Sequence, residues 1–270
     1  MKARGFTLIE LVVAITISAI VVVFAAMFIG APLGAYETHS RRAALIADTS
    51  GAWPRMETDL RAALPNSLRA RRNGAYVAME MLTVLDVGRY KVLPSTSTFD
   101  TGGVYRGIGV PRYLSVNNLG TAAANAYAFS GSMTSAATTL GVVPDLATGE
   151  NHVSANPAPA FTTDSLKQRI YFVEGPVTYL CDETLGTLRR YANYPVAANQ
   201  TSYDTPAKFT AVGAVGELVT SGLTSCNFET SPMDSTARST ATQTAAVRLT
   251  TMRNGDTVTL LHSVHGEYAP

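Results

Sequence analysis

Histidines are the side chains of this sequence whose spacing could indicate a metal site or acid–base chemistry. None of the four belongs to an HExxH motif or to a Cys/His cluster, so we expect no zinc centre. The chain also lacks a GxSxG nucleophile elbow and a GxxxxGK(S/T) phosphate loop. We therefore predict a non-enzymatic protein with no catalytic residue, no metal and no cofactor. The four positions are His39, His152, His262 and His265.

The two cysteines are the other reactive side chains. Cys181 and Cys226 are too few for a disulfide scaffold or a four-thiolate zinc site. Their separation of 45 positions also excludes a CxxC redox pair. At this point either one disulfide or two thiols without a role remain.

The first forty residues contain a long apolar run with one charge inside it. Lys2 and Arg4 precede the run, which extends from Phe6 to Tyr36 and holds only Glu10. As a helix, the uncharged residues 11–36 would span roughly 39 Å at 1.5 Å per residue, more than the ~30 Å hydrocarbon core of a bilayer. The basic residues place the N-terminus in the cytoplasm and the bulk of the chain beyond the membrane.

A secretory signal peptide is the alternative interpretation of this run. Its apolar region is usually about 7 to 15 residues long and precedes a small-residue cleavage site, for which Ala31–Gly34 is a weak candidate. A plain membrane anchor explains the length but not Glu10, because a carboxylate costs about 2.5 to 3.5 kcal/mol at a helix centre and less near the boundary. The glutamate either reaches the headgroups from the interface or has a partner.

The sequence Gly5-Phe6-Thr7-Leu8-Ile9-Glu10, after a short basic leader, resembles the class III signal of type IV pilins and type II secretion pseudopilins. The resemblance implies that a prepilin peptidase cuts between Gly5 and Phe6 and methylates the new Phe6 amine. Glu10 lies one helical turn from that amine. In a bundle of staggered copies it can pair with the Phe6 ammonium of a neighbour and fix the register of assembly.

The helix is expected to continue beyond the membrane. With 1–5 as leader and 6–35 as the transmembrane and assembly helix, residues 36–66 form an amphipathic soluble part, and a glycine–proline cluster at 30–34 predicts a kink. Pro54 predicts a further bend, and Leu64-Pro65-Asn66 a stop. The apolar stripe consists of Leu45, Thr49, Trp53, Met56, Leu60 and Leu64.

The composition describes a folded chain without a global electrostatic field. Hydrophobic residues make up 46% of the 270, and 21 basic against 20 acidic side chains leave a net charge of +1. A cluster of four arginines follows the helix, but no aromatic residue is interleaved with them. We therefore favour a solvated face or a subunit contact and predict no nucleic-acid binding. The arginines are Arg61, Arg69, Arg71 and Arg72.

Residues 67–270 read as strands with turn punctuation. We predict one antiparallel sheet covered by the helix, an α+β pilin-like fold, with a break at Gly175-Pro176 and a hairpin at Asn254-Gly255. Residues 94–164 are rich in small polar residues and should form a loop-rich insertion with some short strands. The strand candidates are Tyr76–Val84, Arg169–Val173, Val177–Cys181, Thr187–Tyr191, Ala246–Met252 and Thr257–His265, with one or two more between Leu218 and Phe228.

Later segments resemble MshO-type minor pilins of the MSHA pilus and, more distantly, J-type pseudopilins of type II secretion. They include Asp59-Leu60-Arg61, Gly88-Arg89-Tyr90, Pro176–Tyr179 with Cys181, and Val258–His265. The resemblance implies a minor pilin near the pilus tip that takes part in the initiation of assembly. The implied partners are other major and minor pilins, the prepilin peptidase, the inner-membrane assembly platform and membrane lipid.

This resemblance also implies a cellular location, and two other functions remain as alternatives. The chain would be a single-pass inner-membrane protein with a periplasmic C-terminal domain that later enters the pilus on the cell surface. A membrane-anchored periplasmic ligand-binding protein or adhesin is one alternative. An anchored hydrolase is another, but it would need a catalytic cluster.

The expected orientation places both cysteines in an oxidising compartment, where thiols normally pair. The family resemblance implies the same, so we expect a bridge between Cys181 and Cys226 that joins two strand ends of one sheet. Two buried apolar thiols are the alternative.

Overall fold

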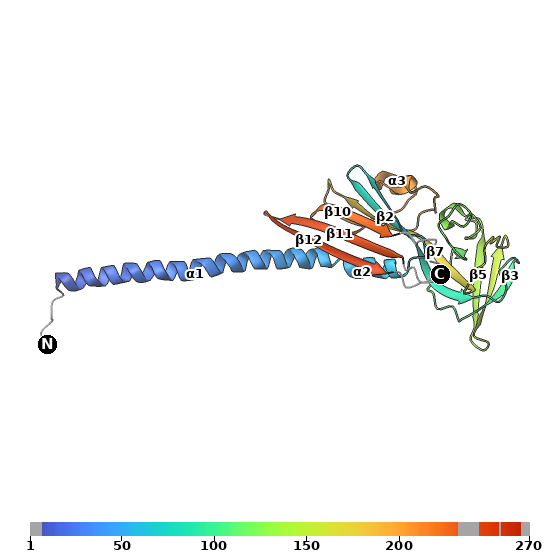
Figure 1. The fold of residues 1–270 in the computed structure, drawn as a ribbon, viewed down its shortest axis with the longest axis horizontal. Helices are drawn as coiled ribbons and strands as arrows, with labels where there is room; N and C mark the ends of the chain where they lie inside the picture. Colours follow the sequence, from blue (N-terminus) through green and yellow to red (C-terminus); the bar gives the residue numbers. More distant parts are fainter. Residues whose placement is uncertain (1–6, 232–242, 254, 266–270) are drawn as a thin grey trace. The chain divides into compact units, whose positions relative to one another are not determined.

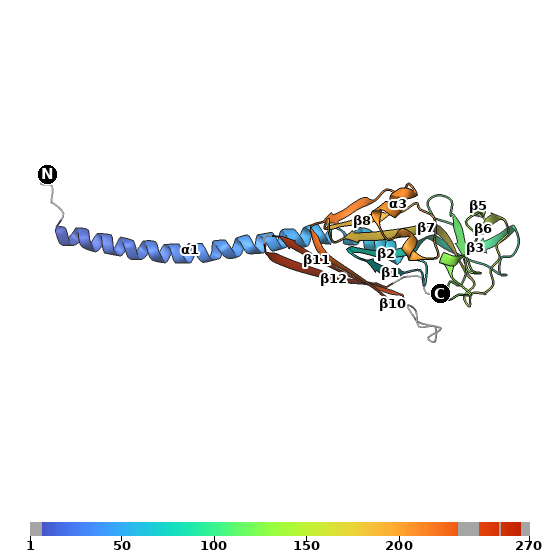
Figure 2. The ribbon, with the colours of Figure 1, turned by 90° about the horizontal axis from the view of Figure 1, so that it is seen from above.

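The computed structural model describes residues 7–231, 243–253 and 255–265, with the backbone alone for 29–35 and 231. The chain divides into two compact units, Met1–Ala47 and Asp48–Pro270. Figures 1 and 2 show the elements of both units in two views.

The helix α1 (Leu8–Ser50) accounts for the described part of the first unit and continues into the second. Its backbone remains helical through residues 30–34, where the sequence predicted a kink. Loss of one backbone donor at Pro32 therefore does not end the helix.

The predicted continuous helix to residue 66 is wrong in detail. The α1 helix ends at Ser50, and a second helix, α2 (Trp53–Arg61), begins after a turn. Pro54 lies in the first turn of α2, where it needs no N–H partner, whereas within a continuous helix its ring would clash with the carbonyl of Ser50. The apolar stripe holds across this break, since Thr49, Met56 and Leu60 are buried.

The larger of two sheets has the strand order β5-β6-β3-β2-β7-β8-β9, and the pairings are antiparallel. Short β1 pairs with β2, and β4 pairs with β7. The strands are β1 (Arg69–Asn73), β2 (Tyr76–Arg89), β3 (Thr98–Gly102), β4 (Tyr113–Ser115), β5 (Thr139–Asp145), β6 (Glu150–Asn156), β7 (Arg169–Asp182), β8 (Thr187–Tyr191) and β9 (Glu217–Ser221). Short helices η1 (Ala126–Ala128), η2 (Gln200–Tyr203) and α3 (Pro206–Ala211) lie in the connections.

The last three strands form a second antiparallel sheet, so the prediction of one sheet is wrong. This sheet has the order β10 (Leu223–Ser231), β11 (Thr244–Arg253) and β12 (Asp256–His265). The predicted hairpin is confirmed, because Arg253 pairs with Asp256. Gly255 has the positive φ, +84°, that such a turn needs, while Asn254 lies outside the described residues.

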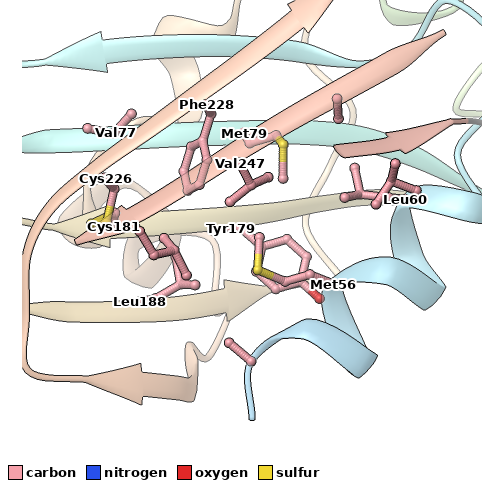
Figure 3. Packing of buried hydrophobic residues seen from close by; sticks show 14 of the residues in the cluster. Met56, Leu60, Val77, Met79, Tyr179, Cys181, Leu188, Cys226, Phe228 and Val247 are labelled. Atoms are coloured by element: carbon pink, nitrogen blue, oxygen red, sulfur yellow. A yellow bond between two sulfur atoms is a disulfide. The ribbon is translucent and has the colours of Figure 1, made fainter. Parts of the chain in front are cut away.

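The main hydrophobic core is built from α2, from the β2, β7 and β8 part of the large sheet, and from the second sheet (Figure 3). Burial on β11 alternates, with Ala245, Val247 and Leu249 fully buried between more exposed neighbours. This alternation is typical of a strand with one face in a core and one in solvent. A sheet on each side buries the apolar faces that a single sheet under one helix would leave exposed.

Strand β7 is continuous where the sequence predicted two strands. Thr83 pairs with Gly175 and Val84 with Val173, so Glu174 is an extra residue in β7. Gly175 adopts φ +154°, which lets the strand bulge and continue.

The insertion over residues 94–164 contains more regular structure than a loop region. Its strands β3, β5 and β6 extend one side of the large sheet, and β4 pairs with β7. The predicted short strands are therefore present, but they are paired into the large sheet and do not form a separate loop region.

Candidate functional site

One helix among the described residues is long and apolar enough, by length and composition, to cross a membrane. It is the segment Leu8–Phe28 of α1, whose 21 residues are all exposed. Its length as a helix is roughly 31 Å at 1.5 Å per residue, close to the thickness of a bilayer's hydrocarbon core.

Glu10 lies in the first turn of α1 and is exposed. The Thr7 hydroxyl accepts a hydrogen bond from the Glu10 backbone N–H at 3.4 Å and donates one to Glu10 Oε2 at 3.4 Å. Thr7 therefore acts as the N-cap of α1 through its hydroxyl, which also bonds to the Glu10 carboxylate, at the positive end of the helix dipole. These bonds hold the carboxylate at the start of the apolar segment and leave it accessible to a partner.

Sequence reasoning did not identify this role of Thr7. The Thr-x-x-Glu spacing of Thr7 and Glu10 is the signal that could have shown it. The other predicted residues of the site, Gly5 and Phe6, lie outside the described residues, so their junction remains a prediction from the sequence.

Cys181 and Cys226 form a disulfide with a Cα–Cα distance of 6.4 Å, and both side chains are fully buried (Figure 3). Cys181 lies near the end of β7 and Cys226 lies in β10. The bridge therefore joins the two sheets across the core, whereas we expected it to join two strand ends of one sheet.

The backbone N–H and carbonyl of Cys226 are both hydrogen-bonded to the ion pair of Arg72 and Glu183. Arg72 Nη1 is 2.6 Å from Glu183 Oε2, and the Cys226 N–H donates to Glu183 Oε1 at 3.0 Å. Arg72 Nη2 in turn donates to the Cys226 carbonyl at 2.9 Å. The hydrogen bonds from Arg72 hold the pKa of Glu183 below its usual value. These contacts satisfy both backbone groups of Cys226.

A second polar cluster ties α2 to the large sheet. Arg190 of β8 donates to both carboxylate oxygens of Asp59, and the Tyr179 hydroxyl donates to Asp59 Oδ2 at 2.7 Å. Burial, with the negative charge of Asp59 next to it, raises the pKa of Tyr179. This cluster joins α2 to β7 and β8, which lie far from it in the sequence.

Glu80 of β2 is completely buried beneath the loop that follows β8. Arg69 lies 2.8 Å from its Oε2, and the Tyr194 hydroxyl donates to its Oε1 at 3.2 Å. Burial raises the pKa of Glu80 to about 7, although Arg69 pulls it down. Arg69 also donates to the carbonyls of Ala197 and Ala198, which fastens the loop to β1.

The four arginines after the helix are each in an intramolecular ion pair, which the sequence did not predict. The side chains of Arg61, Arg71 and Arg72 are 44–48% exposed, which agrees with the expected solvated face. Their acidic partners, and that of Arg69, come from α2, β2, the β7–β8 turn and the η2–α3 connection. The pairs are Arg61–Glu57, Arg69–Glu80, Arg71–Asp204 and Arg72–Glu183.

Within residues 7–231, 243–253 and 255–265, no three His, Cys, Asp or Glu side chains are placed to hold a metal ion. The β-domain histidines make pair contacts. His152 Nδ1 lies 2.6 Å from Asp100 Oδ1, and this hydrogen bond raises the pKa of His152. The His262 ring lies 4.4 Å from the ring of Trp53, measured between centroids.

Comparison with known families gives a match at the N-terminus. Residues 1–26 match the family described as the prokaryotic N-terminal methylation motif. Comparison with curated proteins and comparison with solved structures gave no match.

The chain therefore carries the N-terminal motif of type IV pilin-like prepilins. The motif implies processing by a prepilin peptidase and assembly with other pilins, and it suggests a structural subunit rather than an enzyme. Together with the apolar segment Leu8–Phe28 it fits a single-pass protein anchored in the inner membrane.

Proposed function

We propose that this chain is a minor pilin of the MshO type, assembled into an MSHA-like type IV pilus at or near its tip and active in the initiation of assembly. One observation carries the proposal. The methylation motif over residues 1–26 overlaps an exposed apolar helix segment, Leu8–Phe28, in which Glu10 is the only charged residue.

The chemistry of assembly follows from this segment. The peptidase cleaves the Gly5–Phe6 bond, and methylation of the new amine leaves a cation at Phe6. Glu10 is costly in a membrane alone, but it is compensated when it pairs with the Phe6 ammonium of an adjacent subunit. The bonds from Thr7 keep the carboxylate at the helix start, where a staggered neighbour presents its amine.

The remaining chain is the part displayed beyond the inner membrane, first in the periplasm and then on the pilus. A buried disulfide between its two sheets suits an oxidising compartment. Its partners are other major and minor pilins, the prepilin peptidase, the assembly platform and membrane lipid.

N-terminal mass analysis of the protein from membrane fractions tests the first step. We expect a mature chain that begins with N-methylated Phe6, and a Gly5→Val variant that keeps its leader. Ala3→Val, within the leader but away from the junction, is the matched control and should be processed normally. An intact leader in the wild-type protein, or cleavage near Gly34, would refute the assignment.

A deletion strain distinguishes the proposed pilus from a type II secretion system. We expect loss of surface pili with normal protein secretion, and immunogold labelling of the complemented strain at pilus tips. Loss of secretion with intact pili would instead identify a J-type pseudopilin. Label along the whole shaft would contradict the tip position.

A further inference from the structure

Two neighbouring loops at one end of the central strands expose aliphatic side chains. The loop after β2 presents Val92, which is 81% exposed, and the loop before β7 presents Leu166, which is 89% exposed. Isolated exposed aliphatic residues are common, but two on adjoining loops need a reason.

The loops are fastened to each other from the inside. The Tyr90 N–H donates to the Gln168 carbonyl at 3.0 Å, and the Ser165 N–H donates to the Tyr90 hydroxyl at 2.8 Å. The same hydroxyl donates to Asp164. Tyr90 and Ser165 are buried, as is Pro94 further along the first loop. Val92 and Leu166 are therefore held outward by loops whose inner positions are already filled.

Basic residues flank this pair along the chain. Arg89 and Arg169 are register partners at the adjoining ends of β2 and β7. Lys91 and Lys167 lie beside Val92 and Leu166, and they are two of only four lysines in the sequence. Both lysines are exposed.

The acidic neighbours only partly balance these charges. Glu150 lies 3.2 Å from Lys91 Nζ, and Asp164 accepts from Tyr90. Lys91 is therefore partly neutralised by Glu150, and Lys167 is the exposed cation of the second loop. We call the two loops with Arg89 and Arg169 the basic–aliphatic loop pair.

We propose that the basic–aliphatic loop pair docks on the surface of an anionic phospholipid bilayer. Lysine and arginine attract anionic headgroups, while Val92 and Leu166 can reach the acyl boundary beneath them. A nucleic acid or an acidic polysaccharide would satisfy the cations but offers no hydrocarbon to the aliphatic side chains. This proposal goes beyond the pilin assignment and does not depend on it.

The experiment uses the full chain in nanodiscs of phosphatidylcholine, so that its apolar helix is already embedded. Flotation with added vesicles then measures docking of the exposed domain. Vesicles of phosphatidylcholine alone are compared with vesicles that also contain phosphatidylglycerol. Heparin is the soluble polyanion competitor.

We expect binding to the phosphatidylglycerol vesicles only, weakened by salt. Lys91→Gln with Lys167→Gln should lower the partition constant by roughly fivefold for each lysine, the equivalent of about 1 kcal/mol apiece. Val92→Ser with Leu166→Ser should lower it at every salt concentration. All four positions are exposed, so these variants should fold normally.

Two matched controls remove the same chemistry from other surfaces. Leu185→Ser with Val215→Ser removes two exposed aliphatic side chains, and Arg248→Gln with Arg253→Gln removes two exposed charges from β11. Both should bind like the wild type. Equal binding to both kinds of vesicle would overturn the proposal, as would equal losses in the controls. Loss in the lysine variant alone, with heparin competing fully, would show a polyanion site and also overturn it.

Discussion

Asp59 of α2 and Arg190 of β8 form a two-point ion pair, with Arg190 Nε 2.6 Å from Asp59 Oδ2 and Nη2 3.3 Å from Oδ1. Their side chains are only 11% and 12% exposed. Helix α2 is thus joined to the large sheet by a charge pair shielded from water, in addition to the apolar contacts of Met56 and Leu60.

Asp59→Ala should destabilise the domain by about 3 to 5 kcal/mol, because it leaves Arg190 buried without its carboxylate. Urea unfolding of the full chain in detergent, followed by the fluorescence of Trp53, the only tryptophan, measures this. The control is Glu57→Ala, which removes a partly exposed carboxylate of the same helix that pairs with Arg61 and lies 3.9 Å from His262, and it should move the midpoint much less. Equal shifts in the two variants would contradict a stabilising role of the Asp59–Arg190 pair.

Glu80 makes the stability depend on pH near neutrality. Its pKa is about 7 in the folded protein against 4.5 as the ordinary value, so the folded state binds the extra proton. The stability from this group is fully present below pH ~4.5 and is lost as pH rises through about 7, a change of roughly 3 kcal/mol. Urea midpoints measured from pH 4.5 to 8 should therefore fall.

Glu80→Gln is the matched variant, since an amide keeps the hydrogen-bonding positions but does not ionise. Its midpoints should change less with pH than those of the wild type. His152, whose pKa is also raised, contributes in the same direction, but it does so equally in both proteins. Parallel profiles for wild type and variant would show that Glu80 does not titrate in this range.

Glu10→Leu should leave membrane insertion intact or slightly favoured and abolish incorporation into pili. Fractionation into membranes and sheared surface fibres separates the two effects. Thr16→Val is the control, because the Thr16 hydroxyl bonds to the carbonyls of Val12 and Val13 in its own helix. If the Glu10 variant enters pili as well as this control does, the glutamate is only an interfacial residue.

Reduction of the Cys181–Cys226 bridge should lower the free energy of unfolding by about 4 kcal/mol, the chain-entropy value for its 45-residue separation. Unfolding of the oxidised and reduced wild-type chain measures this without creating a cavity. Mass-tag alkylation of the denatured protein should modify no thiol before reduction and two after it. Two modified thiols in unreduced protein from the native compartment would refute the bridge.

The sequence was most informative where local chemistry decides the structure. Thr187–Tyr191 is a strand with the predicted bounds, and Arg253 pairs with Asp256 as the Asn-Gly pair between them indicated. The α+β class and the apolar N-terminal helix were likewise predictable from hydrophobic periodicity. These features depend on residues close together in the chain.

The errors concern contacts between distant residues. Alternating burial in β11 does not say which core it faces, so two sheets were interpreted as one. Gly175 permits either a turn or a bulge, and the pairing of β7 with β2 decides for the bulge. The partners of Arg71 and Arg72 lie more than a hundred positions away, at Asp204 and Glu183, and no local pattern indicates them.

Strand β12 and helix α2 come from opposite ends of the domain, yet the rings of His262 and Trp53 lie 4.4 Å apart. If the chain is threaded through the membrane behind its N-terminal anchor, α2 emerges first and β12 last. The part of the core that the second sheet adds to Met56 and Leu60 then forms only when nearly the whole chain has crossed. The waiting time before closure of the core is then set by the length of chain still to be exported, and until that point the core lacks the cover of the second sheet.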